Sequence, residues 1–170
     1  MMEGAQPVKR PIGMTILLVL SLVNACMQIF SNLFMFVSAP ILKKMMESGE
    51  LEDSVIPMLS SIDESMVENF SQMMELWMGV PSVYFLITGV LFTGSLVGVI
   101  KMFKLQRLGF HIYSIAQILI LINAVAFVYS HMPQNPFFSE FLTTAMFILI
   151  YHLYFKRIEY DSQAKREQDI

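Results

Sequence analysis

Four long stretches of this 170-residue chain are almost wholly apolar. They are Met14–Phe36, Val83–Phe103, Leu108–Tyr129 and Phe137–Phe155. A helix needs roughly 20 apolar residues to cross the hydrocarbon core of a membrane, and each stretch approaches or exceeds that length. Charged residues make up 15% of the chain, below the roughly 25% that is typical of soluble domains. The sequence therefore predicts an all-α protein with four membrane spans in one integral membrane domain, residues 1–170.

The basic residues are distributed unevenly about these spans. If successive spans cross in alternate directions, one side holds nine of the eleven basic residues, namely Lys9, Arg10, Lys101, Lys104, Arg107, Lys156, Arg157, Lys165 and Arg166. The other side holds only Lys43 and Lys44. Segments rich in Lys and Arg resist translocation, so both termini are expected in the cytoplasm. The expected fold is an antiparallel four-helix transmembrane bundle. Because topology explains the basic residues, we expect no nucleic-acid partner.

The first apolar stretch could be a membrane span or a cleaved signal. Lys9 and Arg10 before an apolar run resemble a secretory signal, and Val23–Cys26 resembles a lipoprotein cleavage box. The run continues past Cys26 to Phe36, however, whereas the apolar part of a signal spans only about 7–15 residues. We therefore expect an uncleaved span with Cys26 buried in the bundle. As the chain's single cysteine, Cys26 cannot form an intramolecular disulfide.

The long connection Ser38–Ser82 is expected to form a helical cap outside the membrane. Pro40 is expected to break the first helix, and Ser61–Glu64 matches the capping box that begins another. One apolar stripe at helical spacing follows this box. It comprises Ile62, Met66, Phe70, Met73, Met74 and Trp77.

The other connections are short. Residues 104–107 should join spans two and three into a tight hairpin, and His131–Pro136 is marked as a turn by its prolines. The polar segment Ile158–Ile170 is expected to be a frayed cytoplasmic tail.

Polar residues recur at spacings of three and four along the first span, so they share one helix face. They are Ser21, Asn24, Gln28, Ser31 and Asn32. An unpaired amide is costly in hydrocarbon, so this face should point into protein or a cavity. Ser114, Gln117 and Asn123 of the third span are the expected partners. The cluster could line a path for water or a polar solute. More simply, it could be hydrogen-bonding glue between helices, worth about 0.6 kcal/mol per bond on average.

A small-xxx-small motif lies in the second span. Gly94 and Gly98 are four residues apart, a spacing that lets two helix backbones approach closely. The motif suits packing within the chain and dimerisation with a second copy equally well.

Few titratable residues lie near the spans. Glu140 enters the fourth span just inside its outer boundary and could form a proton or cation site with His131. More simply, its charge is favourable in the first turn of a helix. His111 and His152 are expected together at the cytoplasmic boundary, where two histidines alone make a poor zinc site. They fit better in an aromatic belt with Tyr113, Tyr151 and Tyr154.

Familiar catalytic signatures are absent from the sequence, including the nucleophile elbow, the phosphate loop, HExxH and CxxC. The methionines of the cap could bind Cu(I) through their thioethers, but their apolar neighbours favour packing. We therefore expect neither an enzyme nor a bound metal or other cofactor.

Two segments carry a resemblance. Lys9–Leu17 (KRPIGMTIL) and Leu108–Tyr113 (LGFHIY) are similar to segments of a group of small four-span bacterial membrane proteins. Members of that group open with a basic residue, a proline and an apolar helix, and carry Gly-Phe-x-x-Tyr near the third span. The resemblance implies a bacterial inner membrane and no particular activity.

These features support three hypotheses about function. The first is a non-enzymatic scaffold or accessory subunit in the lipid bilayer, which docks a protein partner or a second copy through the cap or the Gly-containing span. The second is a small transporter or channel whose polar path is lined by Asn24, Gln28, Asn32 and Gln117. The third is binding of a lipid or another small apolar molecule by the Met-rich cap.

Overall fold

The computed structural model describes residues 11–50, 57–58, 67, 69–70, 79–129 and 137–168, with side chains up to residue 158. Its long elements are four helices: α1 (Ile12–Glu47), α4 (Ser82–Phe103), α5 (Arg107–Phe127) and α6 (Phe137–Gln168). All four are long and apolar enough to cross a membrane. The predicted four membrane-length helices are therefore confirmed, and the chain is described below as a multi-pass membrane protein.

Large apolar side chains cover the outside of the described helices. Val23, Ile100, Ile118 and Leu149 are each more than 40% exposed, and they represent a much longer set on all four helices. A soluble monomer rarely exposes so continuous an apolar surface. A bilayer would cover these side chains, so the exposure pattern agrees with the length of the helices.

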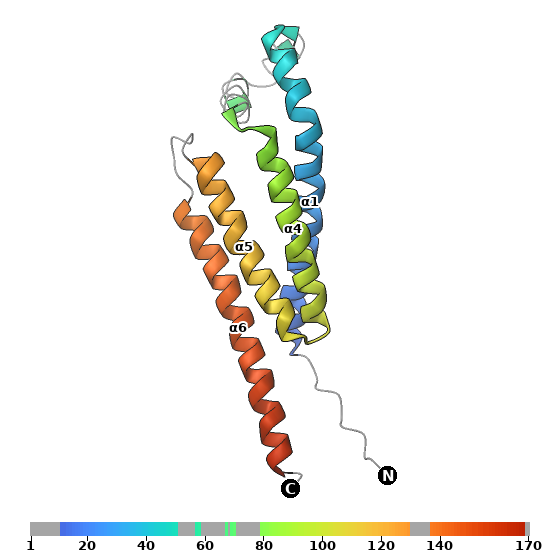
Figure 1. Cartoon of the computed structure of the whole chain (residues 1–170), viewed down its shortest axis with the longest axis vertical. Helices are drawn as coiled ribbons and strands as arrows, with labels where there is room; N and C mark the ends of the chain where they lie inside the picture. Colours follow the sequence, from blue (N-terminus) through green and yellow to red (C-terminus); the bar gives the residue numbers. More distant parts are fainter. Residues whose placement is uncertain are drawn as a thin grey trace.

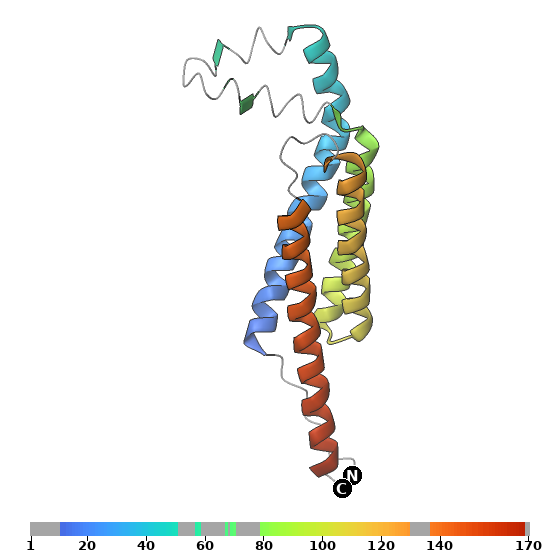
Figure 2. The same cartoon turned by 90° about the vertical axis from the view of Figure 1, so that its left-hand side faces the viewer.

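The helices lie side by side with α4 between α1 and α5 (Figure 1). Helix α4 packs closely against both neighbours, whereas α6 contacts α5 much less extensively. We call the end that holds Ile12, Leu105 and Tyr154 the hairpin end, and the end that holds Tyr84 and Tyr129 the cavity end. Helix α1 extends past its neighbours at the cavity end, and α6 extends past them at the hairpin end (Figures 1 and 2).

Helix α1 does not end at Pro40, so the predicted break is wrong. The 36-residue helix runs on to Glu47 and is about 54 Å long at 1.5 Å per residue. Proline removes one backbone donor, but the turns on either side of Pro40 continue the helix. Helix α6 likewise continues through the segment predicted to be a frayed tail and ends at Gln168. Both helices thus extend beyond the ends of their apolar stretches.

A three-residue turn joins α4 to α5 at the hairpin end. The N–H of Leu105 donates to the Met102 carbonyl at 2.9 Å, and that of Gln106 donates to the Lys101 carbonyl at 3.0 Å. This pair of bonds is the Schellman motif that closes a helix C-terminus. Its left-handed position is held by Leu105, with φ 56°, where glycine is usual. Leu105 packs against the apolar core, which favours this unusual residue.

Helices α4 and α5 approach each other backbone to backbone at Gly98 and Gly109. A Cβ atom on Gly98 would lie 2.7 Å from the Tyr113 nitrogen, and one on Gly109 would lie 2.6 Å from the Gly98 carbonyl oxygen. Gly94 differs, since a Cβ there would only touch Ala116 at an ordinary 3.9 Å. The close contact made by the predicted motif is therefore within the chain, and it depends on Gly98.

All four helices contribute to one apolar core at the hairpin end. Its buried members are Met14, Leu18, Val99, Met102, Tyr113 and Tyr151. Tyr151 is fully buried. Its ring packs edge to face on Tyr113 at 5.3 Å, and its hydroxyl shares a 2.8 Å hydrogen bond with the Ser21 hydroxyl. The assignment of Tyr113 and Tyr151 to an aromatic belt is therefore wrong, because both rings are inside the protein.

The core at the cavity end is built differently. Its buried members are Val80, Phe85, Ala124, Val128 and Tyr129, and the apolar side chains packed on them come from α1, α4 and α5. Helix α6 reaches this second core through its first turn, where the Phe137 ring packs edge to face on Tyr129 at 6.3 Å and Glu140 accepts a hydrogen bond from the Tyr129 hydroxyl. Helix α6 is thus joined to the other three by Tyr151 at the hairpin end and to Tyr129 at the cavity end.

Candidate functional site

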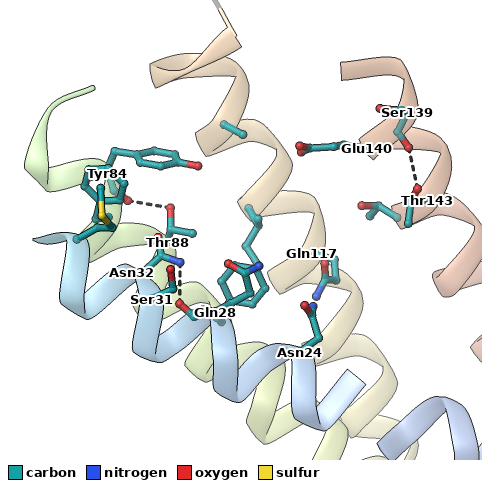
Figure 3. A pocket seen from close by; sticks show the side chains of 16 residues that line it. Asn24, Gln28, Ser31, Asn32, Tyr84, Thr88, Gln117, Ser139, Glu140 and Thr143 are labelled. Carbon is teal, nitrogen blue, oxygen red and sulfur yellow. Dashed lines mark hydrogen bonds between the residues drawn. The ribbon is translucent and has the colours of Figure 1, made fainter. Parts of the chain in front are cut away.

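A cavity of about 400 Å³ lies among the four helices toward the cavity end (Figure 3). Each helix contributes side chains to its wall. Those from α1 are Asn24, Gln28, Ser31, Asn32 and Met35, and those from α4 are Tyr84, Phe85, Thr88 and Phe92. Those from α5 are Gln117, Ile120 and Ala124, and those from α6 are Ser139, Glu140, Thr143 and Thr144.

The polar stripe of α1 forms one wall of this cavity. Asn24, Gln28, Ser31 and Asn32 all line it, because their spacing of three and four places them on one side of the helix. Asn32 is buried, and its side-chain nitrogen donates to the Gln28 carbonyl at 2.7 Å. The predicted stripe therefore faces a cavity, except for Ser21, which is bonded to Tyr151 in the core.

Gln117 of α5 lines the same cavity. Asn24, Gln28 and Asn32, which were predicted to form a polar cluster with it, line the cavity too. Its side-chain nitrogen donates to the Ser95 hydroxyl of α4 at 3.0 Å. Gln117 thus both joins two helices and lines the space between them.

The other two predicted members of the cluster lie elsewhere. Asn123 is buried between α4 and α5, where its side-chain nitrogen donates to the Thr88 hydroxyl at 2.9 Å and toward the Tyr84 carbonyl at 3.4 Å. It acts as interhelical glue. Ser114 is not among the lining residues, and its buried hydroxyl has no hydrogen-bond partner in the described part of the chain.

Within the part of the chain that the structure describes, Glu140 is the only charged residue that lines the cavity. It lies in the first turn of α6 and projects from that helix toward the other three (Figure 3). The Tyr129 hydroxyl donates a hydrogen bond to one of its carboxylate oxygens. The sequence analysis did not predict this tyrosine partner, and the partner it did predict, His131, lies outside the described residues. The structure therefore shows a carboxylate held by a tyrosine at one wall of the cavity.

Several lining residues were missed by the sequence reasoning. Tyr84 and Thr88 are four residues apart on α4, and the Thr88 hydroxyl donates to the Tyr84 carbonyl at 2.8 Å. Ser139, Thr143 and Thr144 lie with Glu140 on one face of α6. Their spacing was a usable signal, because Ser139 and Thr143 are four residues apart, as are Glu140 and Thr144, and residues four apart share a helix face.

The remaining predicted residues stand apart from this cavity. Cys26 is exposed on α1, so the expectation that it is buried is wrong. Its position, two residues from Gln28, turns it away from the cavity wall. Of the cap stripe, only Phe70 is described, as a half-buried helical residue, and Ile62, Met66, Met73, Met74 and Trp77 lie outside the described residues.

The chemistry available to the cavity is hydrogen bonding plus one negative charge. Amides and hydroxyls both donate and accept, whereas an ionised carboxylate only accepts. The described residues contain no group of three or more His, Cys, Asp or Glu side chains that could hold a metal ion. The wall therefore suits water, a neutral polar molecule or a small cation.

A second cavity, also of about 400 Å³, lies between α5 and α6 at the hairpin end. It brings together His111 and His152, as expected for residues of one boundary, and adds Arg107, Phe110, Phe155 and Lys156. Both histidines are exposed.

No protein-family model, curated protein or solved structure matches this chain.

Proposed function

We propose that this protein is a small transporter or channel that takes a polar solute, neutral or cationic, into a chamber within its four spans. The observation that carries the proposal is the wall of the first cavity. Amides and hydroxyls from all four helices converge on a space of about 400 Å³, which is within the roughly 300–1,000 Å³ of small-molecule sites.

The energetics of the membrane support this proposal over simple glue. Each polar group buried in hydrocarbon without a partner costs several kcal/mol, so polar residues in spans turn toward one another or toward water. Asn123 and Ser21 show the first solution, since each is bonded to a neighbouring helix. Asn24 and Gln28 face a cavity instead, which is the second solution. A polar occupant would satisfy the side chains that the protein leaves facing the space.

The charge of the wall favours a cation over an anion. Among the described residues, Glu140 is the one charged group in the lining, and the lining contains no described Arg or Lys. A carboxylate with low-dielectric walls around it raises the local concentration of positive solutes. Intramembrane acidic residues that face a cavity commonly mark ion or substrate pathways.

The distribution of basic residues gives the proposed orientation. With both termini in the cytoplasm of a bacterial cell, the hairpin end is cytoplasmic and the cavity end faces outward. Glu140 and Tyr84 then lie near the outer surface, and the chamber is loaded from outside the cell.

Cysteine labelling tests whether the chamber is hydrated. Gln28→Cys is placed in a Cys26→Ala background and compared with the natural chain, whose exposed Cys26 does not line the cavity. The change at Gln28 leaves in place the hydrogen bond that its backbone carbonyl accepts from the Asn32 side chain. Only a thiolate reacts with methanethiosulfonates, and a thiolate needs water. In liposomes, we expect the cavity cysteine to react at least about 100-fold faster than Cys26.

The same assay tests the role of Glu140. We expect a trimethylammonium reagent to label the cavity cysteine about tenfold faster than a sulfonate reagent. Glu140→Gln should remove that preference, whereas Glu47→Gln, the same change at the far end of α1, should retain it. Equal labelling of the cavity cysteine and Cys26 would reject the hydrated chamber. An unchanged preference in Glu140→Gln would reject the cation preference alone.

The scaffold and lipid-binding hypotheses depend mainly on the outer cap. Its apolar stripe lies outside the described residues apart from Phe70. The Gly-containing span, the other proposed docking surface, uses Gly98 to pack on α5 within the chain. The polar chamber is therefore the feature that favours one hypothesis over the others.

A further inference from the structure

The second cavity has a chemistry opposite to that of the first. Its lining comprises the cationic side chains of Arg107 and Lys156, the imidazoles of His111 and His152, and the rings of Phe110 and Phe155. Among the side chains that the structure describes, which end at residue 158, no acidic one lines this cavity. The cavity is thus a basic site with aromatic walls, formed by two helices that contact each other only sparsely.

The two helices place the basic groups at one level. Arg107 is the first residue of α5, and Lys156 follows directly after the last apolar stretch of the sequence, on α6. In a membrane, both side chains would lie where the hydrocarbon ends and the headgroups begin. The N-terminus of α5 adds partial positive charge to the same place.

The aromatic residues fix the inner wall. The Phe110 ring lies 5.9 Å from the His152 ring and 6.1 Å from the Phe155 ring, centroid to centroid. His111 is also in ring contact with Phe110, at 5.6 Å. An imidazole can donate an N–H bond in either protonation state. The rings therefore present donors beside an apolar surface.

We propose that this cavity binds an anionic phospholipid, with the phosphate held by Arg107, Lys156 and the two histidines and an acyl chain lying against Phe110 and Phe155. Arginine matches the geometry of phosphate with two parallel donors, and lysine supplies a compact charge. Basic pockets between spans on the cytoplasmic side are suited to such headgroups. A free phosphate would use the same donors but would leave the aromatic wall uncovered, so the lipid is the occupant that both halves of the cavity favour. This proposal does not depend on the polar chamber.

Lipid titration of the purified full chain, followed by native mass spectrometry, tests the proposal. The probes are dioleoyl phosphatidylglycerol and dioleoyl phosphatidylcholine, which share their acyl chains. We expect the anionic lipid to bind at least about tenfold more tightly. The variant Arg107→Gln/Lys156→Gln should lower that affinity by roughly thirtyfold, because each basic side chain near an anionic headgroup contributes about fivefold.

The matched control is Lys104→Gln/Arg157→Gln. It removes the same net charge at the same end of the molecule, from exposed residues that do not line the cavity. Its affinity for phosphatidylglycerol should stay within about twofold of the natural chain, since the loss is local and not a change of net charge. If Arg107→Gln/Lys156→Gln does not fold, the adjacent single changes Lys156→Gln and Arg157→Gln give the same comparison, with an expected difference of about fivefold.

Competition with inorganic phosphate distinguishes the two possible occupants, a phospholipid headgroup and free phosphate. We expect inorganic phosphate not to displace the bound phosphatidylglycerol. Displacement at comparable affinity would mean that the site takes free phosphate, and it would overturn the lipid assignment. Equal binding of the two lipids, or equal losses in the cavity variant and the control, would overturn the site itself.

Discussion

Gly98→Ala is expected to destabilise the protein by about 1–3 kcal/mol. The added Cβ would lie 2.7 Å from the Tyr113 nitrogen and 2.9 Å from both the Gly109 oxygen and the Tyr113 Cα. All three are backbone atoms, so no side chain can rotate to relieve the contact. The α4 and α5 backbones must separate, and the dispersion contacts between them weaken over several residues. Unfolding in mixed detergent micelles measures the change in free energy.

Gly94→Ala is the matched control for Gly98→Ala. It is the same change one turn earlier on the same helix, and its Cβ would meet only Ala116 at 3.9 Å. Because alanine also has the higher helix propensity, by about 1 kcal/mol, this variant should be as stable as the natural chain or more so. Gly109→Ala should behave like Gly98→Ala, because it approaches the same contact from α5. Equal stability of the Gly94 and Gly98 variants would contradict the close approach.

Tyr151→Ala is expected to destabilise the protein by about 3–5 kcal/mol, the usual range for deleting a buried aromatic side chain. The ring is fully buried and connects α6 to the core through Tyr113 and Ser21. Its loss leaves a cavity at the place where all four helices meet. The same micelle unfolding assay gives the free energy.

Two further variants separate the contribution of the Tyr151 ring from that of its hydroxyl and from the general effect of truncating a side chain of α6. Tyr151→Phe keeps the ring and loses the hydroxyl that Ser21 contacts, so it should cost only about 0.6 kcal/mol. Leu153→Ala changes an exposed residue of the same helix and should stay within about 0.5 kcal/mol of the natural chain. If Tyr151→Ala resembled Leu153→Ala, the ring would not be part of the core.

The four helices could be predicted because each is marked by a long, uninterrupted apolar stretch of the sequence. Runs of about 20 apolar residues between short polar segments leave few alternatives in a bilayer. The polar face of α1 could be predicted for the same reason, since Asn24, Gln28 and Asn32 repeat at helical spacing. That Gln117 joins them at one cavity depends on depth in the membrane, which the sequence also gives approximately.

The exposure of Cys26, the burial of Tyr151 and the contribution of α6 to the cavity depend on how the helices pack against one another. The spacing of residues along a single helix does not predict that packing. The amides predict which face of α1 turns inward, but Cys26 lies on another face of that helix and was assigned to the interior because it is small; the structure exposes it. Tyrosines near the ends of spans suggest a position at the membrane interface. Tyr151 is instead buried, and its hydroxyl is hydrogen-bonded to Ser21, which lies 130 residues earlier in the chain. The participation of α6 in the cavity depends on how its first turn packs against Tyr129, a contact that no single-helix pattern predicts.

The Schellman turn and the glycine contact have a consequence for the order in which the molecule assembles. Gly98 and Gly109 are separated by eleven positions in the chain, so their contact closes a short loop and forms rapidly. The Ser21–Tyr151 bond spans 130 positions and must await synthesis of the last helix. The α4–α5 hairpin is thus expected to fold as the earliest stable unit, with α1 as its first neighbour. The polar space is enclosed last, when α6 arrives.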